Sequence, residues 1–217
     1  MSTVVNRTRR SSRSAVRGLL RWLALRLARA RTMFNLPGHV TSEGKLPSLD
    51  GATAWLNSPP LRAADLRGRV VVLQFWSYTC VDWLRTFPYL VAWEDRYTSA
   101  GLLVIGVHVP EHSFEHDVEN VRRAVNGLGI KYPIAIDNHY VISDALKNPS
   151  TPTLYIADAK RRIRRHFFGE QAYDEAEQLI RQLLREAGAR EIPPLADAQP
   201  RENSAIAAET GPGPSRV

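Results

Sequence analysis

Cys80 is the residue whose side chain has the most chemistry to offer, because it is the only cysteine among the 217 residues. A cysteine thiolate is a nucleophile that can attack a disulfide or a peroxide. The hydroxyls of Ser77 and Thr79 lie just before it, and the guanidinium of Arg85 follows about one helical turn later. These three side chains could assist a thiolate, either by hydrogen bonding or by positive charge.

The flanking elements would place Cys80 at the start of a helix. Residues 69–76 form a β-branched and aromatic run, which is typical of a strand buried on both faces of a sheet. The free N–H groups at a helix N-terminus favour an anion by roughly 0.3–1 kcal/mol, whereas the carboxylate of Asp82 opposes one. A lone cysteine can equally be a small buried hydrophobe, so its position leaves both interpretations open. Apolar residues then recur at helical spacing through about Ser99, at Leu84, Phe87, Leu90, Val91 and Tyr97.

An ordered series of motifs resembles the thioredoxin superfamily. Residues 64–76, followed by Cys80 and Pro88, resemble its TlpA-like, redoxin and AhpC/TSA-related branch, in which a proline at that offset kinks the first active-site helix. The sequence Thr-Pro-Thr at 151–153 precedes the strand-like residues 154–157 and matches the cis-proline loop that faces the cysteine in this superfamily. An X-Pro bond costs only about 0.5–1 kcal/mol to hold in the cis form, so a fold can readily adopt one there.

The closer resemblance is to the DipZ-like subgroup, and the likeness as a whole covers about residues 46–186. It implies an α/β thioredoxin fold, with a central mixed sheet flanked by helices and a cis-proline loop. It also implies that Cys80 is catalytic and that Thr151, Pro152, Trp76 and Trp83 lie where a substrate binds. The subgroup motifs are at residues 76–80, 106–111 and 132–138.

Two departures from the family pattern limit the chemistry. The family's Cys-x-x-Cys uses a second thiol to resolve the mixed disulfide, and Trp83 occupies that second position. Many thioredoxins also bury an acid six residues before the first cysteine, and that position here is Gln74, which cannot accept a proton at neutral pH. Because the chain has no other cysteine, a self-contained dithiol cycle is excluded, and one-thiol chemistry or none remains.

Three hypotheses remain open. In the first, Cys80 reduces a peroxide or attacks a disulfide, and an external thiol or a cysteine-bearing protein resolves it. Ser77 stands where peroxiredoxins hold a Thr or Ser, but Leu73 replaces their proline. In the second, Cys80 captures a cysteine-bearing partner without turnover. In the third, the domain is redox-inactive and Trp83 packs in the place of the second cysteine.

Other polar residues offer weaker signals. His108 and Glu111 resemble residues at the family's active-site rim, where they could hydrogen-bond a sulfenate or a substrate thiol; a solvated loop is the alternative. His108, His112 and His116 are spaced four apart, but Pro110 prevents one continuous helix from aligning them. We therefore predict no metal site, and no phosphate loop or dinucleotide motif indicates another cofactor.

The basic charge is concentrated at the N-terminus. The net charge is +7, and the first 31 residues carry nine arginines and no acid, which leaves −2 for residues 32–217. The main domain therefore shows no electrostatic footprint for nucleic acid. Residues 1–35 are predicted to form a basic arm or an amphipathic helix that could contact a membrane surface, without spanning it. A cytoplasmic location is favoured, with export or membrane-surface association as alternatives, and translation could also start at Met33.

The remaining pattern predicts one domain at residues 36–188 and a disordered tail at 189–217, which is rich in proline and glycine. Residues 102–108 and 134–136 read as strands, and Ser113 is predicted to cap a helix that carries Phe114, Val118 and Val121 on its apolar face. A helical piece ends near Leu146. Residues 154–157 and 163–168 are predicted to form a hairpin across residues 158–160, before a closing amphipathic helix at 176–184.

Overall fold

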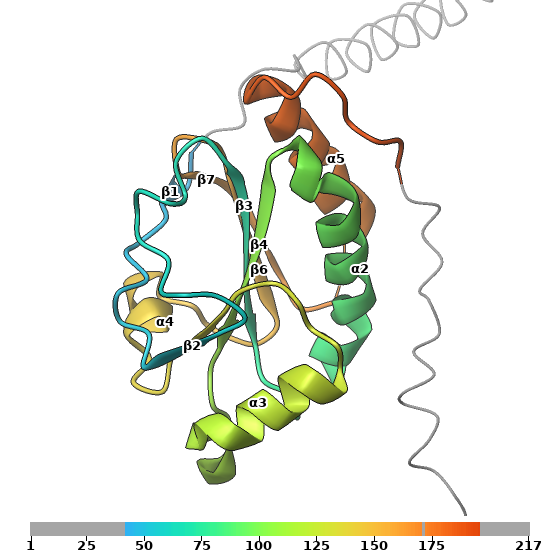
Figure 1. The fold of residues 1–217 in the computed structure, drawn as a ribbon. Helices are drawn as coiled ribbons and strands as arrows, with labels where there is room; N and C mark the ends of the chain where they lie inside the picture. The colour runs from blue at the N-terminus through green and yellow to red at the C-terminus, as the bar shows by residue number, and fades with distance from the viewer. Residues whose placement is uncertain (1–41, 171, 196–217) are drawn as a thin grey trace, which may run out of the picture. The chain divides into compact units, whose positions relative to one another are not determined.

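The computed structural model describes residues 42–170 and 172–195 (Figure 1). The arm predicted at 1–35 and the tail from residue 196 onward lie outside the described residues, and residues 189–195 contain no helix or strand. The strands are β1 (Gly44–Lys45), β2 (Ala54–Leu56), β3 (Val70–Trp76), β4 (Leu102–His108), β5 (Ile134–Ile136), β6 (Thr153–Ala157) and β7 (Arg162–Phe168). The helices are α2 (Val81–Tyr97), α3 (Val118–Gly127), α4 (Val141–Ala145) and α5 (Tyr173–Glu186), with 3-10 turns η1 (Thr98–Ala100) and η2 (Ser113–His116).

The strands form one mixed sheet in the order β1-β7-β6-β3-β4-β5-β2. The central strand, β3, pairs in parallel with β4 and antiparallel with β6. Every residue of β3 is buried, as expected of a continuous apolar run that is covered on both faces. Helices α2 and α5 lie on one side of the sheet, and α4 lies on the other (Figure 1). The predicted α/β thioredoxin fold is confirmed.

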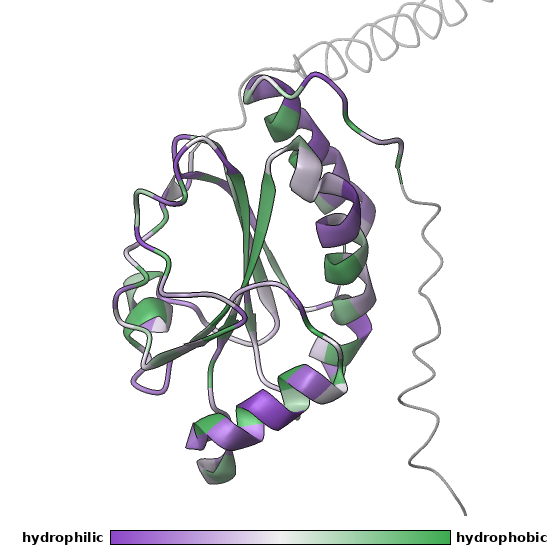
Figure 2. Ribbon diagram, viewed as in Figure 1, coloured by the Kyte–Doolittle hydropathy of each residue, from purple (hydrophilic) through white to green (hydrophobic). Residues whose placement is uncertain are grey.

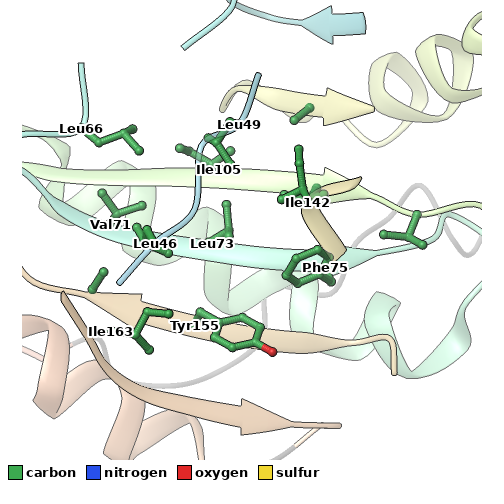
Figure 3. Packing of buried hydrophobic residues seen from close by; sticks show 14 residues of the cluster. Leu46, Leu49, Leu66, Val71, Leu73, Phe75, Ile105, Ile142, Tyr155 and Ile163 are labelled. Atoms are coloured by element: carbon green, nitrogen blue, oxygen red, sulfur yellow. The ribbon is translucent and has the colours of Figure 1, made fainter. Parts of the chain in front are cut away.

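Alternate side chains of β3 enter two apolar layers. Leu73 and Phe75 point toward α4, where they pack with Ile142 and Tyr155 (Figure 3). On the α2 side, the buried layer is aromatic and includes Trp76, Trp83 and Trp93, each no more than 2% exposed. Figure 2 shows apolar residues concentrated on the central strands and polar residues on the outer faces of the helices. The strand that leads to Cys80 is therefore held rigidly from both sides.

The segment after β4 differs from the prediction. Ser113 begins the short turn η2 instead of capping a long helix, and α3 begins only at Val118. The N-cap is Asp117, whose carboxylate accepts the Glu119 backbone N–H at 2.9 Å. Phe114 is 51% exposed and takes no part in the apolar face of α3. The N-cap of η2 is His112 instead of Ser113, because the Glu115 side chain accepts the His112 backbone N–H in a capping box.

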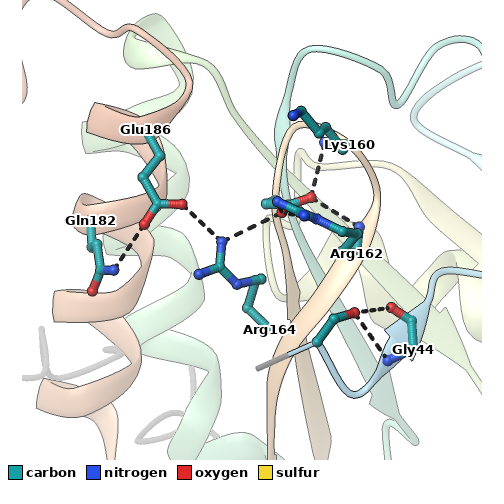
Figure 4. A network of polar contacts seen from close by, with 8 residues as sticks. Gly44, Lys160, Arg162, Arg164, Gln182 and Glu186 are labelled. Carbon is teal, nitrogen blue, oxygen red and sulfur yellow. Dashed lines mark hydrogen bonds and ion pairs between the residues drawn. The ribbon is translucent and has the colours of Figure 1, made fainter. Parts of the chain in front are cut away.

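The predicted hairpin of β6 and β7 is present, and a polar network joins it to α5 (Figure 4). The Asp158 carboxylate accepts backbone N–H groups of Lys160 and Arg162, both at 3.0 Å. Arg164 lies between Asp158 and Glu186, at 3.4 Å and 2.8 Å. Burial by itself raises the pKa of Asp158, but the bonds from Arg162 and the turn N–H groups hold that pKa below its usual value. The network fixes the strand that follows the cis-proline loop.

Candidate active site

Cys80 is the N-cap residue of α2, as the sequence pattern predicts. Its backbone is extended, with φ −75° and ψ 109°, and its side chain is partly exposed. The Cys80 backbone N–H donates to the carbonyl of Ser77, and its own carbonyl accepts the Leu84 N–H, both at 3.2 Å. The buried strand β3 and the first turn of α2 thus place the thiol at a helix N-terminus, where unpaired N–H groups favour an anion.

The cis-proline loop lies beside the thiol. The Thr151–Pro152 peptide bond is cis, and the Thr151 carbonyl oxygen is 4.0 Å from the Cys80 Sγ atom. The Thr151 hydroxyl donates to the carboxylate of Glu111. The loop before β6 therefore contacts both the sulfur, which belongs to the loop before α2, and the loop after β4. A neighbouring cavity lined by Pro152 has a volume of only about 10 Å³, which is no more than a water molecule needs, and Cys80 does not line it.

Trp83 and Gln74, the two departures from the family pattern, bond to each other. The Trp83 indole N–H donates to the Gln74 amide oxygen at 2.9 Å, and the Gln74 amide N–H donates to the Thr86 hydroxyl at 2.9 Å. The indole also packs against Trp76, with ring centroids 4.4 Å apart and the ring planes tilted by 31°. Trp76 and Trp83 are both 0% exposed, so neither presents a surface to a substrate, and their contacts are those of core residues.

Glu115 is a central residue of this region that the sequence reasoning missed. Its side chain is fully buried. Its Oε1 atom accepts the hydroxyls of Ser77 at 2.6 Å and Thr79 at 2.9 Å. Its Oε2 atom accepts the backbone N–H groups of Glu111 at 2.5 Å and His112 at 3.0 Å. No local sequence pattern indicates this role, because Ser77 and Thr79 are 38 and 36 residues away from Glu115 along the chain.

The hydrogen bonds around Glu115 determine its charge. Burial by itself raises the pKa of this carboxyl, but the donors from Ser77, Glu111, Thr79 and His112 together hold the pKa below its usual value. The carboxylate is therefore ionised at neutral pH. A buried charge that receives this many hydrogen bonds stabilises the conformation that supplies the donors.

His108 is buried beneath this loop and is not an open rim residue. It is 0% exposed, and neither ring nitrogen has a hydrogen-bond partner within residues 42–170 and 172–195. Its ring stacks on Tyr78 at 5.6 Å and meets the edge of Trp76 at 5.1 Å. Burial lowers the pKa of His108 to about 4, against an opposing effect of the Glu115 charge. The imidazole is consequently neutral at pH 7.

Arg85 lies on the exposed face of α2. Its guanidinium contacts the carboxylates of Asp82 at 3.2 Å and Glu170 at 2.9 Å, and its side chain is 61% exposed. Its positive charge is thus largely compensated before it can act on the thiol.

The part of the chain that the structure covers contains no group of three His, Cys, Asp or Glu side chains suited to a metal ion. Among the same residues, no helix is sufficiently long and apolar to cross a membrane.

Comparison with known proteins agrees with this geometry. The model of the AhpC/TSA family matches residues 45–166. Protein DipZ of Mycobacterium tuberculosis (strain CDC 1551 / Oshkosh) is 44% identical over 147 residues, which is 66% of this chain and 21% of DipZ. The chain thus spans about a fifth of the length of that relative.

Solved structures of thioredoxin-like proteins are also similar to this chain. A thioredoxin-like protein in its oxidised form has a TM-score of 0.60 at 26% identity, over 66% of this chain and 96% of the other. A thiol-disulfide isomerase from Corynebacterium glutamicum has a TM-score of 0.58 at 28% identity, over 64% of this chain and 96% of the other. With the family match over residues 45–166, the chain belongs to the AhpC/TSA family, and its fold is that of thioredoxin-like proteins.

Proposed function

We propose that the protein uses Cys80 as its single redox nucleophile, and that an external thiol completes each reaction. The observation that carries this proposal is the placement of the thiol: Cys80 is partly exposed at the N-cap of α2, and its sulfur lies 4.0 Å from the Thr151 carbonyl of the cis-proline loop. The thiolate is the attacking form, and a helix N-terminus favours it. Thr151 and Pro152 would receive an extended substrate next to the sulfur.

The proposed exchange balances without a second protein thiol. Cys80 releases its proton to solvent, and the thiolate attacks one sulfur of a partner disulfide. A Cys80–partner S–S bond forms while the partner's S–S bond breaks, and the leaving thiolate takes up a proton. An external thiolate then attacks the Cys80 sulfur, which forms a Cys80–external S–S bond and releases the second partner thiol. A second external thiolate attacks the external sulfur of that bond, so that an external disulfide forms and Cys80 is regenerated. The net result is one reduced partner disulfide and one oxidised pair of external thiols.

Peroxide reduction would use the same atom. The Cys80 thiolate attacks a peroxide oxygen, the O–O bond breaks, and the products are a sulfenic acid and water or an alcohol. An external thiol condenses with the sulfenic acid and releases water, and a second external thiol restores Cys80. The reductant is either a small-molecule thiol or a cysteine-bearing protein.

Membrane contact through residues 1–35 remains a prediction.

The second candidate is a redox-inactive binding domain, and one observation favours it. Trp83 occupies the place of the resolving thiol as a fully buried side chain, with a hydrogen bond to Gln74. This pair stabilises the core without contributing to thiol chemistry. A domain of this kind would bind a cysteine-free partner as well as a cysteine-bearing one, and its affinity would not depend on the oxidation state of Cys80.

Alkylation of the native protein distinguishes the two candidates. Iodoacetamide is added to the folded protein and to the protein in denaturant, and mass spectrometry locates the label. We expect Cys80 to react in the folded state, to exchange with an aromatic disulfide and to release one equivalent of the aromatic thiol. Cys80→Ser should abolish both signals. A thiol that reacts only after denaturation would refute the enzymatic proposal and leave the binding domain.

A further inference from the structure

One buried side chain joins two of the loops near the sulfur, and a second carboxylate joins the third. Glu115 accepts the hydroxyls of Ser77 and Thr79, which immediately precede Cys80 in the chain. With its other oxygen, it accepts the backbone N–H groups of Glu111 and His112, in the loop after β4. The Cys80 loop and the β4 loop therefore share one carboxylate.

The third loop is joined through Glu111. The Thr151 hydroxyl donates to the Glu111 carboxylate, and the Thr151 carbonyl oxygen is the atom 4.0 Å from the Cys80 sulfur. The polar contacts thus lead from the thiol loop through Glu115 and Glu111 to the cis-proline loop, and then back to the sulfur. A change at Glu115 would loosen both sides of the gap in which a substrate disulfide must lie.

These contacts are well suited to hold a precise geometry. Glu115 is 0% exposed, and each of its oxygens receives two donors. Buried charge-assisted hydrogen bonds are shorter and stronger than neutral ones, and water cannot replace them without a conformational change. Ser77 is itself fully buried, and its hydroxyl also accepts the Thr79 backbone N–H at 3.3 Å. The loop that ends in Cys80 therefore has few alternative conformations.

We propose that Glu115 is a positioning residue for the reaction of Cys80: it orients the thiol loop toward the cis-proline loop, so that the sulfur attacks a disulfide held there. The inference rests on the proposed function of Cys80. Glu115 itself touches neither substrate nor the reacting sulfur in this arrangement. Its effect should appear when the attacked bond is held by the loop, and not when a small reagent approaches freely.

The test compares two reactions of the same thiol. One reagent is iodoacetamide, which needs an accessible thiolate and no particular orientation. The other is an extended pentapeptide whose central cysteine is joined by a disulfide to 5-thio-2-nitrobenzoate, and whose release of the yellow thiolate is followed by absorbance. For each folded variant, the rate constant with the peptide disulfide is divided by the rate constant with iodoacetamide.

The hydrogen bonds of Glu115 to Ser77, Thr79, Glu111 and His112 are called the Glu115 clamp below. The variants separate the effect of this clamp from an effect on general stability. Thr79→Val keeps the shape of residue 79 and removes its hydroxyl, whereas Thr79→Ser keeps the hydroxyl; Ser77→Ala is added to the valine variant. Glu115→Met removes the carboxylate directly. Glu177→Met is the matched control, because Glu177 is also buried and accepts the hydroxyl of Tyr97, at the far end of α2 from Cys80. Circular dichroism and a urea midpoint establish that each variant is folded.

We expect the ratio of rate constants to fall by roughly ten- to a hundredfold in Ser77→Ala/Thr79→Val, because a small misplacement of reacting groups has effects of this size. Thr79→Ser should keep the wild-type ratio, and Glu177→Met should lower stability while leaving the ratio unchanged. Glu115→Met should behave like the double variant; if it does not fold, the hydroxyl variants decide the question.

Two results would overturn the proposal. One is a wild-type ratio in folded Ser77→Ala/Thr79→Val, and the other is an equal fall of the ratio in Glu177→Met. Failure of the proposed function would look different, because the folded wild-type protein would then react with neither reagent while the denatured protein would still react with iodoacetamide.

Discussion

Replacement of His108 by phenylalanine should remove a specific part of the pH dependence of stability. His108 is fully buried between Tyr78 and Trp76, and both ring nitrogens lack partners within the described part of the chain. Protonation would place a cation among aromatic rings, with the Glu115 carboxylate favouring that charge and His116 disfavouring it. Phenylalanine keeps an aromatic ring in this layer and cannot take up a proton.

The expected magnitude follows from the two pKa values. Burial lowers the pKa of His108 from 6.5 in the unfolded chain to about 4 in the folded protein. The unfolded state therefore binds more protons in the window between pH 6.5 and pH 4, so the stability contributed by His108 is complete above pH 6.5 and declines as the pH falls through this window. Linkage over this range gives a loss of about 2 kcal/mol between pH 7.5 and pH 5, approaching about 3 kcal/mol below pH 4.

The assay is urea unfolding of the wild-type protein and His108→Phe at pH 7.5 and pH 5.0. The comparison is made within each protein, between its two free energies of unfolding, so a constant cost of the substitution cancels. Carboxyl groups whose pKa is shifted, such as Asp158, contribute equally to both proteins and also cancel. We expect the wild-type protein to lose about 2 kcal/mol more than the variant on acidification. Equal losses in the two proteins would show that His108 takes up its proton without cost. The assignment of His108 as a buried, neutral imidazole would then be wrong.

Three further predictions concern the core and the helix ends. Gln74→Leu and Trp83→Phe should be coupled by about 1 kcal/mol in a double-mutant cycle of urea unfolding, because each single change leaves a buried polar atom without its partner. If their effects on the free energy of unfolding are additive, the indole–amide bond contributes nothing. The double variant Trp83→Cys/Gln74→Asp should form a reversible disulfide with Cys80, seen as the loss of two alkylation sites on oxidation; its absence in a folded protein would mean that the helix start departs from the geometry of its relatives. Asp117→Ala should lower the free energy of unfolding by about 1 kcal/mol, since it removes the side-chain acceptor at the N-cap of α3, whereas the same loss from Ser113→Ala would restore Ser113 as the cap.

The elements with local signals could be predicted from the sequence. Six of the seven residues at 70–76 are apolar, with Gln74 the exception, and a run of that kind is typical of a strand covered on both faces, as the central strand β3 is. The helical spacing after Cys80 and the turn residues at 158–160 are equally local, and they predict α2 and the β6–β7 hairpin. The Thr-Pro-Thr motif indicated the cis-proline loop through its resemblance to relatives.

The start of α3 could not be predicted in the same way. Ser113 and Asp117 are both good N-cap residues, so local propensity leaves the choice between them open. In the structure, His112 and Glu115 form a capping box around η2, and the Asp117 carboxylate caps α3. Glu115 also accepts the hydroxyls of Ser77 and Thr79, a contact with a distant part of the chain that local propensity does not contain. Phe114 then remains exposed, although its spacing alone suggested the apolar face of a helix.

By itself, the sequence determined that there is a single thiol and where strands and helices alternate, because these depend on residue identity and on patterns within a few neighbouring positions; the thioredoxin fold and the position of a second thiol followed from the resemblance to relatives. Only the tertiary structure decided what surrounds that thiol. The bond between Trp83 and Gln74, the burial of His108 and the Glu115 clamp all join side chains from different elements. Hydrogen bonds and burial depend on which groups come into contact in the folded protein, and a pattern along the chain does not specify contacts between distant residues.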